Sequence, residues 1–223
     1  MSSSPAPGAP APEPRAPRRP GRGTIVAASA LAVALGGGLI ACGQGSASGS
    51  PAPDVSVTDS ATTRPGKDTA GRPMKRSKPV RLAVPSAGVD ASPVLDLGLD
   101  ANQELQVPSV AQAERPGWYT GSVTPGEKGA SVLVAHYDTA EGPALMRNVA
   151  RVRTGDLIEV GRADGTTAEF RIREIQQVDK KAFPTRKVYG ATDRPELRLI
   201  TCGGPIEGGH RADNIILYAD LVR

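Results

Sequence analysis

Cys202, His136 and Arg211 are the residues whose types and spacing could together carry out acyl transfer. Cys202 follows Leu197–Thr201, in which apolar residues alternate as in a strand, and precedes a pair of glycines. A thiolate held at a strand end has a fixed line of approach to a carbonyl carbon. A small buried core residue is an equally good interpretation of this segment alone, because free cysteines are among the most buried residues.

His136 directly follows SVLVA (131–135), a continuous apolar run of strand length that is typical of a central strand. A single histidine in such a place is more often structural than catalytic, but this one leaves a strand just as Cys202 does. The second histidine, His210, lies in a glycine-rich loop, where we expect an exposed bystander.

Arg211 lies nine residues after Cys202, in the loop before the last expected strand. An imidazole can transfer protons, a thiolate can attack, and a guanidinium, which stays protonated, can donate hydrogen bonds to an oxyanion. The alternative for Arg211 is a surface charge or a partner of Asp213. This chemistry needs no metal or other cofactor, and no acidic cluster has the spacing of a calcium loop.

The elements that must position these side chains are short strands broken by turns. A hairpin is expected around 163–165, and the only good helical candidate is 144–152. The pattern favours a mainly β domain, a closed barrel or a sandwich, over about 145 residues, which is ample for one core. The expected strands are 80–84, 94–99, 105–107, 117–119, 131–135, 157–160, 167–175, 197–201 and 214–222.

Charge is spread unevenly along the chain. Residues 1–78 carry ten Lys or Arg and four Asp or Glu, a net charge of +6, whereas residues 79–223 carry 17 and 19, a net charge of −2. The high pI therefore belongs to the N-terminal part. A domain that binds nucleic acid needs a basic patch, with aromatic residues for single strands, and residues 79–223 show no such pattern.

The N-terminal part indicates export. Residues 1–23 are rich in Pro and Arg, and Thr24–Ala41 is an uncharged run of eighteen residues, just long enough to cross a bilayer. The preceding arginines favour a cytoplasmic N-terminus and an extracytoplasmic domain at the cell membrane. We favour an uncleaved signal anchor, although Leu39–Gly43 also resembles a lipobox in which Cys42 would be lipidated; simple cleavage is a third alternative.

Residues 42–78 lack hydrophobic periodicity and predict a flexible extracytoplasmic linker before a domain at 79–223. Its basic end, Lys75, Arg76 and Lys78, is expected to be a solvated charge run, with contact to anionic lipid or wall polymer as the alternative. A disulfide between Cys42 and Cys202 is not expected, because it would fold the linker back onto the domain. Cys202 would then be the domain's only thiol.

Taken together, these segments resemble the sortases, and most closely the class F sortases of actinobacteria. The resemblance covers Pro79–Arg223. Its most specific part is the Thr-Cys strand with an upstream histidine. The matching motifs are Val84–Asp90, Gly117-Trp118-Tyr119, His136 with Asp138, Phe183-Pro184, Val188-Tyr189-Gly190, Asp193–Gly204 and Asp213-Asn214.

The resemblance implies a closed eight-stranded β-barrel with one short helix. It also implies a cysteine transpeptidase or peptidase that cleaves an LPXTG-like sorting signal and joins the acyl part to a cell-wall amine. Exported proteins bearing the signal and that amine would be its partners, with Cys202 as nucleophile, His136 as acid/base and an arginine at the oxyanion. Two departures stand out: Ala135 and Tyr137 replace a glycine and a smaller residue, and the arginine is expected at Ala212 instead of Arg211.

Two other functions fit part of the pattern. An L,D-transpeptidase is also an exported Cys/His enzyme, but its histidine and cysteine would stand in an SHGC-like context, whereas 66 residues separate them here. An exported lipoprotein with a β-barrel binding module would keep Cys202 only as core. Reaction of an exposed thiol with a small alkylating agent would separate an enzyme from a module.

Overall fold

The computed structural model describes residues 51–57 and 71–223. Nine strands form one sheet in the order β2-β1-β8-β9-β11-β10-β5-β4-β3, and β6 pairs with β7. The strands are β1 Pro79–Val84, β2 Val89–Ala91, β3 Leu95–Leu97, β4 Gly117–Tyr119, β5 Gly129–Val134, β6 Asp138–Thr139, β7 Gly142–Pro143, β8 Leu157–Arg162, β9 Thr167–Asp179, β10 Pro195–Glu207 and β11 His210–Leu221. The helix is α1, Thr185–Tyr189, and four 3-10 turns are η1 Pro85–Ala87, η2 Val110–Gln112, η3 Val149–Arg151 and η4 Lys180–Ala182.

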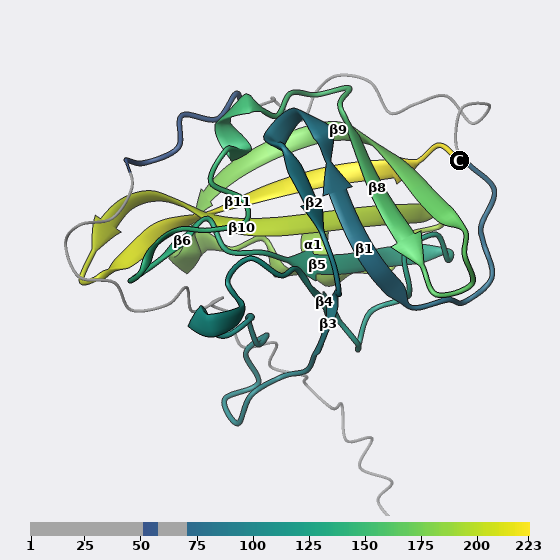
Figure 1. Ribbon diagram of the computed structural model, residues 1–223, viewed down its shortest axis with the longest axis horizontal. Helices are drawn as coiled ribbons and strands as arrows, with labels where there is room; N and C mark the ends of the chain where they lie inside the picture. The colour runs from purple at the N-terminus through teal and green to yellow at the C-terminus, as the bar shows by residue number, and fades with distance from the viewer. Residues whose placement is uncertain (1–50, 58–70) are drawn as a thin grey trace, which may run out of the picture. The chain divides into compact units, whose positions relative to one another are not determined.

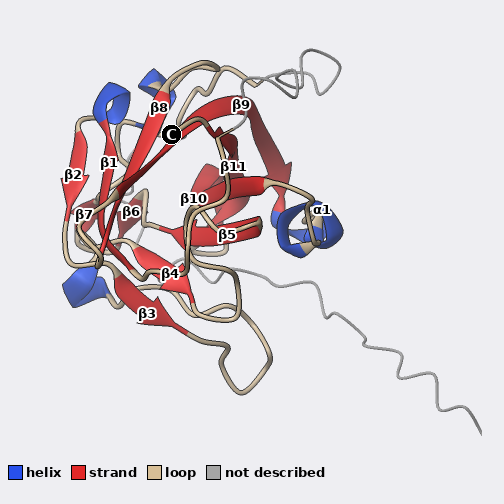
Figure 2. Cartoon of the chain, turned by 90° about the vertical axis from the view of Figure 1, so that its right-hand side faces the viewer, coloured by secondary structure: helices blue, strands red, loops and turns tan. Residues whose placement is uncertain are grey.

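The sheet curls strongly but does not close, so the prediction of a closed eight-stranded barrel is wrong (Figure 2). Its end strands are β2 and β3, and no pairing between these two short strands is found among the described residues. Only Ser92, Pro93 and Val94 connect them, and Pro93 has no N–H to donate to a ladder. The result is a half-barrel whose two edges are three-residue strands, which are poor templates for further pairing.

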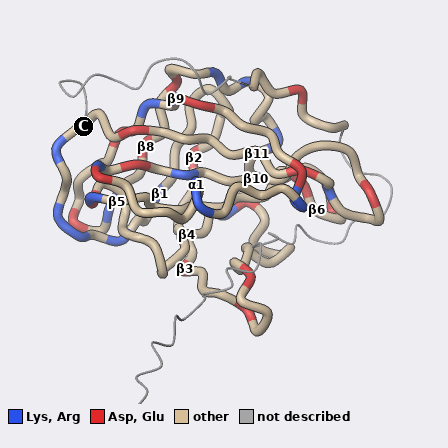
Figure 3. Tube along the Cα trace, turned by 180° about the vertical axis from the view of Figure 1, so that it is seen from behind, with Lys and Arg blue, Asp and Glu red and all other residues tan. Residues whose placement is uncertain are grey.

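The expected helix at 144–152 is also wrong. This stretch is a turn that ends in η3, because its backbone donors bond elsewhere: Ala144 N–H donates to the Tyr137 carbonyl and Met146 N–H to the His136 carbonyl. The helix that does form, α1, lies between β9 and β10, and Figures 2 and 3 show it against the outer side of the sheet.

Strand β10 runs through the middle of the sheet with both faces buried. It pairs in parallel with β5 and antiparallel with β11 (Figure 1). Leu199 aligns with Leu133 and Leu217 on the inner face, and Ile200 aligns with their neighbours Val134 and Ile216 on the outer face. All these side chains are buried, and the outer face is covered by the segment that contains α1. A residue of β10 is therefore held rigidly by packing on both sides.

Backbone hydrogen bonds to the domain begin before Pro79, the expected start of the domain. Gly71 N–H donates to the Leu221 carbonyl at 2.6 Å and Met74 N–H to the Gly126 carbonyl at 2.8 Å, so residues 71–78 lie along the domain. The expected membrane segment Thr24–Ala41 and the lipobox cysteine Cys42 lie outside the described residues. Within the described ranges, no helix has the length and apolar character needed to cross a bilayer.

Candidate active site

Cys202 lies inside β10 and not at its end. The strand continues through Gly203 and Gly204 to Glu207, so the expected glycine turn after Cys202 is wrong. The pairing with β11 shifts register between Gly203 and Ile206. Gly204 has φ +74°, and a Cβ on it would lie 2.5 Å from an Asp213 carboxylate oxygen, so a residue without a side chain is required there. The two glycines thus let β10 bend just beyond the sulfur instead of ending there.

Cys202 of β10 and Asn214 of β11 lie opposite each other, and His136 follows the end of β5, the strand on the other side of β10; these three residues are called the row below. Cys202 is directly opposite Asn214 of β11, so their side chains share the outer face. On the other side, Val134 of β5 aligns with Ile200, and Ala135 N–H donates to the Ile200 carbonyl at 3.0 Å. This register brings His136, two residues after Val134, level with Cys202. The parallel pairing of β5 with β10 supports the predicted meeting of the cysteine and the histidine, which stays a prediction.

His136 is held by a backbone carbonyl, a group for which a residue type provides no signal. Its Nε2 lies 2.6 Å from the Pro108 carbonyl oxygen, and the residue is 3% exposed. A carbonyl oxygen can only accept, so Nε2 must carry the hydrogen. Nδ1 is then the ring nitrogen that takes up and releases a proton, which is the arrangement an acid/base needs.

Arg211 is buried and pairs with a carboxylate. Its Nη2 lies 2.6 Å from Asp138 Oδ2, its Nε also donates to Asp138, and its Nη1 donates to the Gly204 carbonyl at 2.8 Å. The guanidinium carbon lies 5.0 Å from the centre of the Tyr137 ring. Arg211 is 4% exposed, so the alternative of a surface charge is wrong. These contacts hold β6, the strand after His136, to β11, the strand after Cys202.

His210 is the first residue of β11 and pairs in register with Glu207 at the hairpin end. It is partly exposed and four residues before Asn214 along the strand. The hairpin end carries it away from the level of Cys202 and Asn214.

Residues 51–57 lie against this site. Tyr137 Oη donates to the Pro51 carbonyl at 2.7 Å, and a Cβ on Gly203 would lie 3.7 Å from Pro53 Cγ. Val55 is buried, at 8% exposed. Burial raises the pKa of Tyr137 and Asp138 adds to this, although Arg211 opposes it, so the hydroxyl stays a donor at neutral pH. This part of the expected linker therefore covers the nucleophile's neighbours.

The Cys202 sulfur is in a disulfide in this structure, contrary to the expectation of a thiol. The other cysteine of the sequence, Cys42, lies outside the described residues. A disulfide sulfur is not a nucleophile, so the chemistry predicted for Cys202 requires the reduced form.

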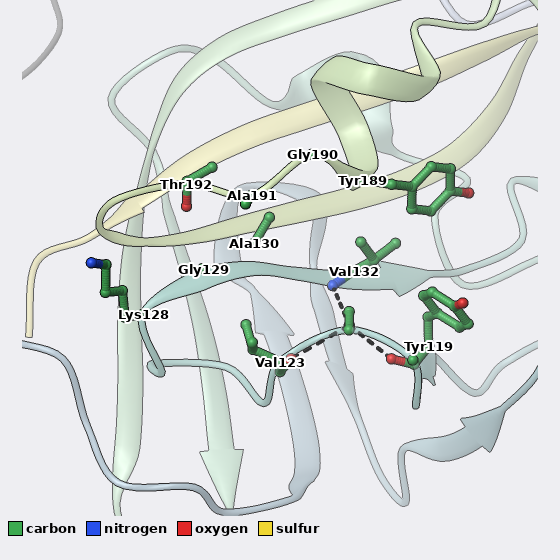
Figure 4. A pocket seen from close by; sticks show the side chains of 12 residues that line it. Tyr119, Val123, Lys128, Gly129, Ala130, Val132, Tyr189, Gly190, Ala191 and Thr192 are labelled. Atoms are coloured by element: carbon green, nitrogen blue, oxygen red, sulfur yellow. Dashed lines mark hydrogen bonds between the residues drawn. The ribbon is translucent and has the colours of Figure 1, made fainter. Parts of the chain in front are cut away.

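A pocket of about 330 Å³ opens farther along the same outer face (Figure 4). Its floor includes Ala130 and Val132 of β5, and Val132 aligns with Arg198, four residues before Cys202 on β10. At about 3.3 Å per residue, the pocket lies roughly 13 Å along the strand from the sulfur. Burial raises the pKa of Tyr189 in its wall to about 12, with Tyr119 adding to this. The lining residues are Tyr119, Gly121, Ser122, Val123, Lys128, Gly129, Ala130, Val132, Tyr189, Gly190, Ala191 and Thr192.

Buried charges lie at the far end of this face. Arg198 Nη2 is 2.6 Å from Glu196 Oε2, and Arg173 reaches the same oxygen at 2.8 Å. Burial by itself would raise the pKa of Glu196, but the two guanidinium groups outweigh it and hold that pKa below its usual value. Arg198 Nε also donates to the Lys187 carbonyl at 3.4 Å, which ties α1 to the strand that carries Cys202.

Residues 82–222 match the family model described as the sortase domain. The chain belongs to the sortase family. Members of this family are cysteine transpeptidases, and the presence of Cys202 is consistent with that activity. This membership decides against an L,D-transpeptidase and against a binding module without catalysis.

Solved sortases share the fold. Sortase C-1 from Actinomyces oris is 22% identical, with a TM-score of 0.51 over 66% of this chain and 76% of that one. Sortase C1 of Streptococcus agalactiae, solved in complex with MTSET, is 17% identical, with a TM-score of 0.50 over 66% of this chain and 70% of that one. The pilus-related sortase C of Group B Streptococcus is 16% identical, with a TM-score of 0.50 over 67% and 70%. No curated protein matches this sortase in sequence.

The sequence did not predict three groups that contribute to the site. The Pro108 carbonyl is a backbone group, and a residue type gives no signal for it. Asp138 was visible only as a neighbour of His136, although it pairs with a guanidinium 73 residues away. Pro51 belongs to a segment of linker composition, in which a contact to Tyr137 has no sequence signature.

Proposed function

We propose that this sortase is a class F-like enzyme that cleaves an LPXTG-like sorting signal and transfers the acyl part to a cell-wall amine. The observation that carries the proposal is the parallel pairing of β5 with β10, whose register, continued two residues beyond Val134, would bring His136 level with Cys202. The class assignment is supported by the sequence motifs, above all Leu197–Gly204 with Asp213-Asn214.

In the first half-reaction, the thiolate of reduced Cys202 attacks the carbonyl carbon of the scissile peptide bond. The S–C bond forms while the carbonyl electron pair moves to oxygen, which gives a tetrahedral oxyanion. Protonated His136 gives the Nδ1 proton to the leaving nitrogen, the C–N bond breaks, and an acyl-thioester remains. The Nε2 hydrogen bond to Pro108 keeps the ring in the orientation that this transfer requires.

In the second half-reaction, a primary amine attacks the thioester carbonyl. His136 takes the proton that the amine loses, the C–S bond breaks, and the thiolate returns while a new amide forms. The pocket beside Tyr119 and Tyr189 lies on the face where an extended peptide would run, and we assign it to residues of the sorting signal upstream of the cleaved bond. Arg211 remains the predicted donor to the oxyanion.

The proposal includes a cellular location for the enzyme. The uncharged run Thr24–Ala41, preceded by arginines, supports a domain held at the outer face of the cell membrane, either by a signal anchor or by lipid on Cys42. Labelling cells with palmitate and comparing Cys42→Ser with the parent would separate the two. Recovery of intact protein that still contains residues 1–22 would decide against lipidation.

The test is mass spectrometry of the reduced protein after incubation with a panel of peptides, each containing one sorting-signal variant. An acyl-enzyme on Cys202 that disappears when an amine such as triglycine is added, with a new amide product, is the expected result. Cys202→Ala should lose both the adduct and the product, and it should melt within a few degrees of the reduced parent because little volume is removed. Cleavage by folded Cys202→Ala would contradict the proposal.

A further inference from the structure

Asn214 has a side chain that nothing in the described structure satisfies. It is 0% exposed, and neither its amide nitrogen nor its carbonyl oxygen has a hydrogen-bond partner within the described residues. A buried carboxamide without partners is unfavourable, and such groups are rare in native proteins. They are tolerated where the missing partner arrives during function.

Its neighbours leave one direction for that partner. Asn214 lies between Val178 of β9 and Cys202 of β10 in the register of the sheet. Val178 offers no polar group, so the carboxamide faces an apolar residue on one side and the sulfur on the other. Residues directly opposite in an antiparallel pair have Cβ atoms on the order of 5 Å apart. The amide nitrogen can therefore reach an oxygen on a carbon that is bonded to the sulfur.

The same face lacks the donor that the sequence led us to expect. Ala212, two residues before Asn214 on β11, occupies the position where an arginine was expected. Arg211 donates instead to Asp138 and to the Gly204 carbonyl. A carboxamide is a suitable donor beside Arg211, because a fixed, neutral N–H donor stabilises a developing oxyanion at any pH.

We propose that Asn214 is a catalytic residue whose amide nitrogen donates a hydrogen bond to the oxyanion formed when Cys202 attacks a carbonyl. The inference rests on the proposed function only in that Cys202 is the nucleophile. During attack the carbonyl electron pair moves to oxygen and the Asn214 N–H binds that oxygen. On collapse the pair reforms the carbonyl, and Asn214 gains and loses no proton.

The test compares two reactions of reduced Cys202. Para-nitrophenyl acetate acylates a thiolate through a tetrahedral oxyanion, whereas iodoacetamide alkylates it by displacement without one. Neither needs a sorting signal, so failure of the parent to cleave any peptide would refute the proposed substrate and leave this test intact. The variants are Asn214→Ala and Asn214→Leu, the second of nearly the same shape. Asn148→Ala is the control, because its amide donates to the Ala87 carbonyl, outside the row.

We expect both Asn214 variants to lose on the order of a hundredfold in acylation rate, with alkylation within about twofold of the parent. Asn214→Leu should also melt at or above the parent temperature, since it removes an unsatisfied polar group without leaving a cavity. Asn148→Ala should keep both rates. Unchanged acylation, or equal losses in acylation and alkylation, would overturn the proposal. A clear fall in the melting temperature of Asn214→Leu would do so as well, because it would show a structural partner.

Discussion

Asp138 and Arg211 form a buried ion pair that joins the chain after His136 to the chain after Cys202. The Asp138 Oδ2 and Arg211 Nη2 atoms are 2.6 Å apart, and the side chains are 9% and 4% exposed. Removing one partner of such a pair leaves a buried charge without compensation, which costs far more than losing a surface pair. The pair thus fixes the distance between the two segments that carry the proposed nucleophile and acid/base.

Asp138→Asn should therefore lower the free energy of unfolding by about 3 kcal/mol, measured by urea denaturation of the reduced protein. The matched control is Glu114→Gln, which breaks the exposed pair between Glu114 and Arg147 and should change little. Replacing both partners, Asp138→Leu with Arg211→Met, should recover much of the loss. If Asp138→Asn is as stable as the control, the pair does not hold the two segments together.

Arg211 has its own kinetic prediction. If its guanidinium serves the oxyanion, Arg211→Ala should lower kcat on the order of a hundred- to a thousandfold and change KM much less. Arg211→Lys keeps the charge but loses the planar fork, so it should recover little. A parental kcat in a folded Arg211→Ala protein would confine Arg211 to its structural contacts with Asp138 and Gly204.

The buried cluster of Glu196 with Arg198 and Arg173 predicts how the stability of the fold depends on pH. Its folded pKa is lowered, so the carboxylate stabilises the fold above its unfolded pKa of about 4.3, and this contribution is lost as pH falls through the folded pKa. Glu196→Gln leaves Arg198 buried without this partner and should cost about 3 kcal/mol at pH 7. Thermal melts from pH 7 to pH 3 should show the difference between parent and variant shrinking below about pH 5.

The pKa of Asp220 is shifted in the opposite direction to that of Glu196, because burial raises it. It shares Arg173 with Glu196, so the Asp220→Asn variant should be measured beside Glu196→Gln. Asp90→Asn, at the exposed pair with Arg81, serves as the surface control. A gap between parent and Glu196→Gln that stays constant down to pH 3 would contradict the assignment of the acid-sensitive contribution to Glu196.

Substitution of Val55 tests whether residues 51–57 restrict access to the site. Val55 is 8% exposed, whereas Val57 is 55% exposed. Val55→Asp should release the contacts of Pro51 and Pro53 and speed iodoacetamide alkylation of reduced Cys202, while Val57→Asp should not. Peptide kinetics should show a lower KM with kcat unchanged. Equal alkylation rates for Val55→Asp, Val57→Asp and the parent would mean that the segment does not restrict access.

The sequence predicted the elements whose pattern is local. Strand β5, the β8–β9 hairpin and the last strand follow from apolar alternation and a turn signal, and all three are confirmed. His136 and Cys202 each follow an apolar run, and those two runs pair in parallel, but the meeting of the two side chains stays a prediction.

The features that the sequence did not predict depend on partners distant in the chain. The β10 strand passes through Gly203-Gly204 because β11 keeps pairing beyond the bend, and glycine pairs read more simply as a turn. The stretch 144–152 fails to form a helix because its donors bond Tyr137 and His136. Arg211 could not be placed from the sequence, because its direction depends on a one-residue change of register and on Asp138.

The contacts of Pro51 with Tyr137 and of Pro53 with Gly203 also affect how readily a substrate peptide binds at the site. Because this segment and the site belong to one chain, its local concentration at Cys202 stays constant when the enzyme is diluted. A substrate peptide must therefore compete with residues 51–57, which cannot diffuse away. Its apparent affinity equals the intrinsic affinity multiplied by the fraction of molecules in which the site is uncovered. Tension along residues 51–57 would raise that fraction, so the extension of the chain that leads to the domain would itself set how readily a substrate binds.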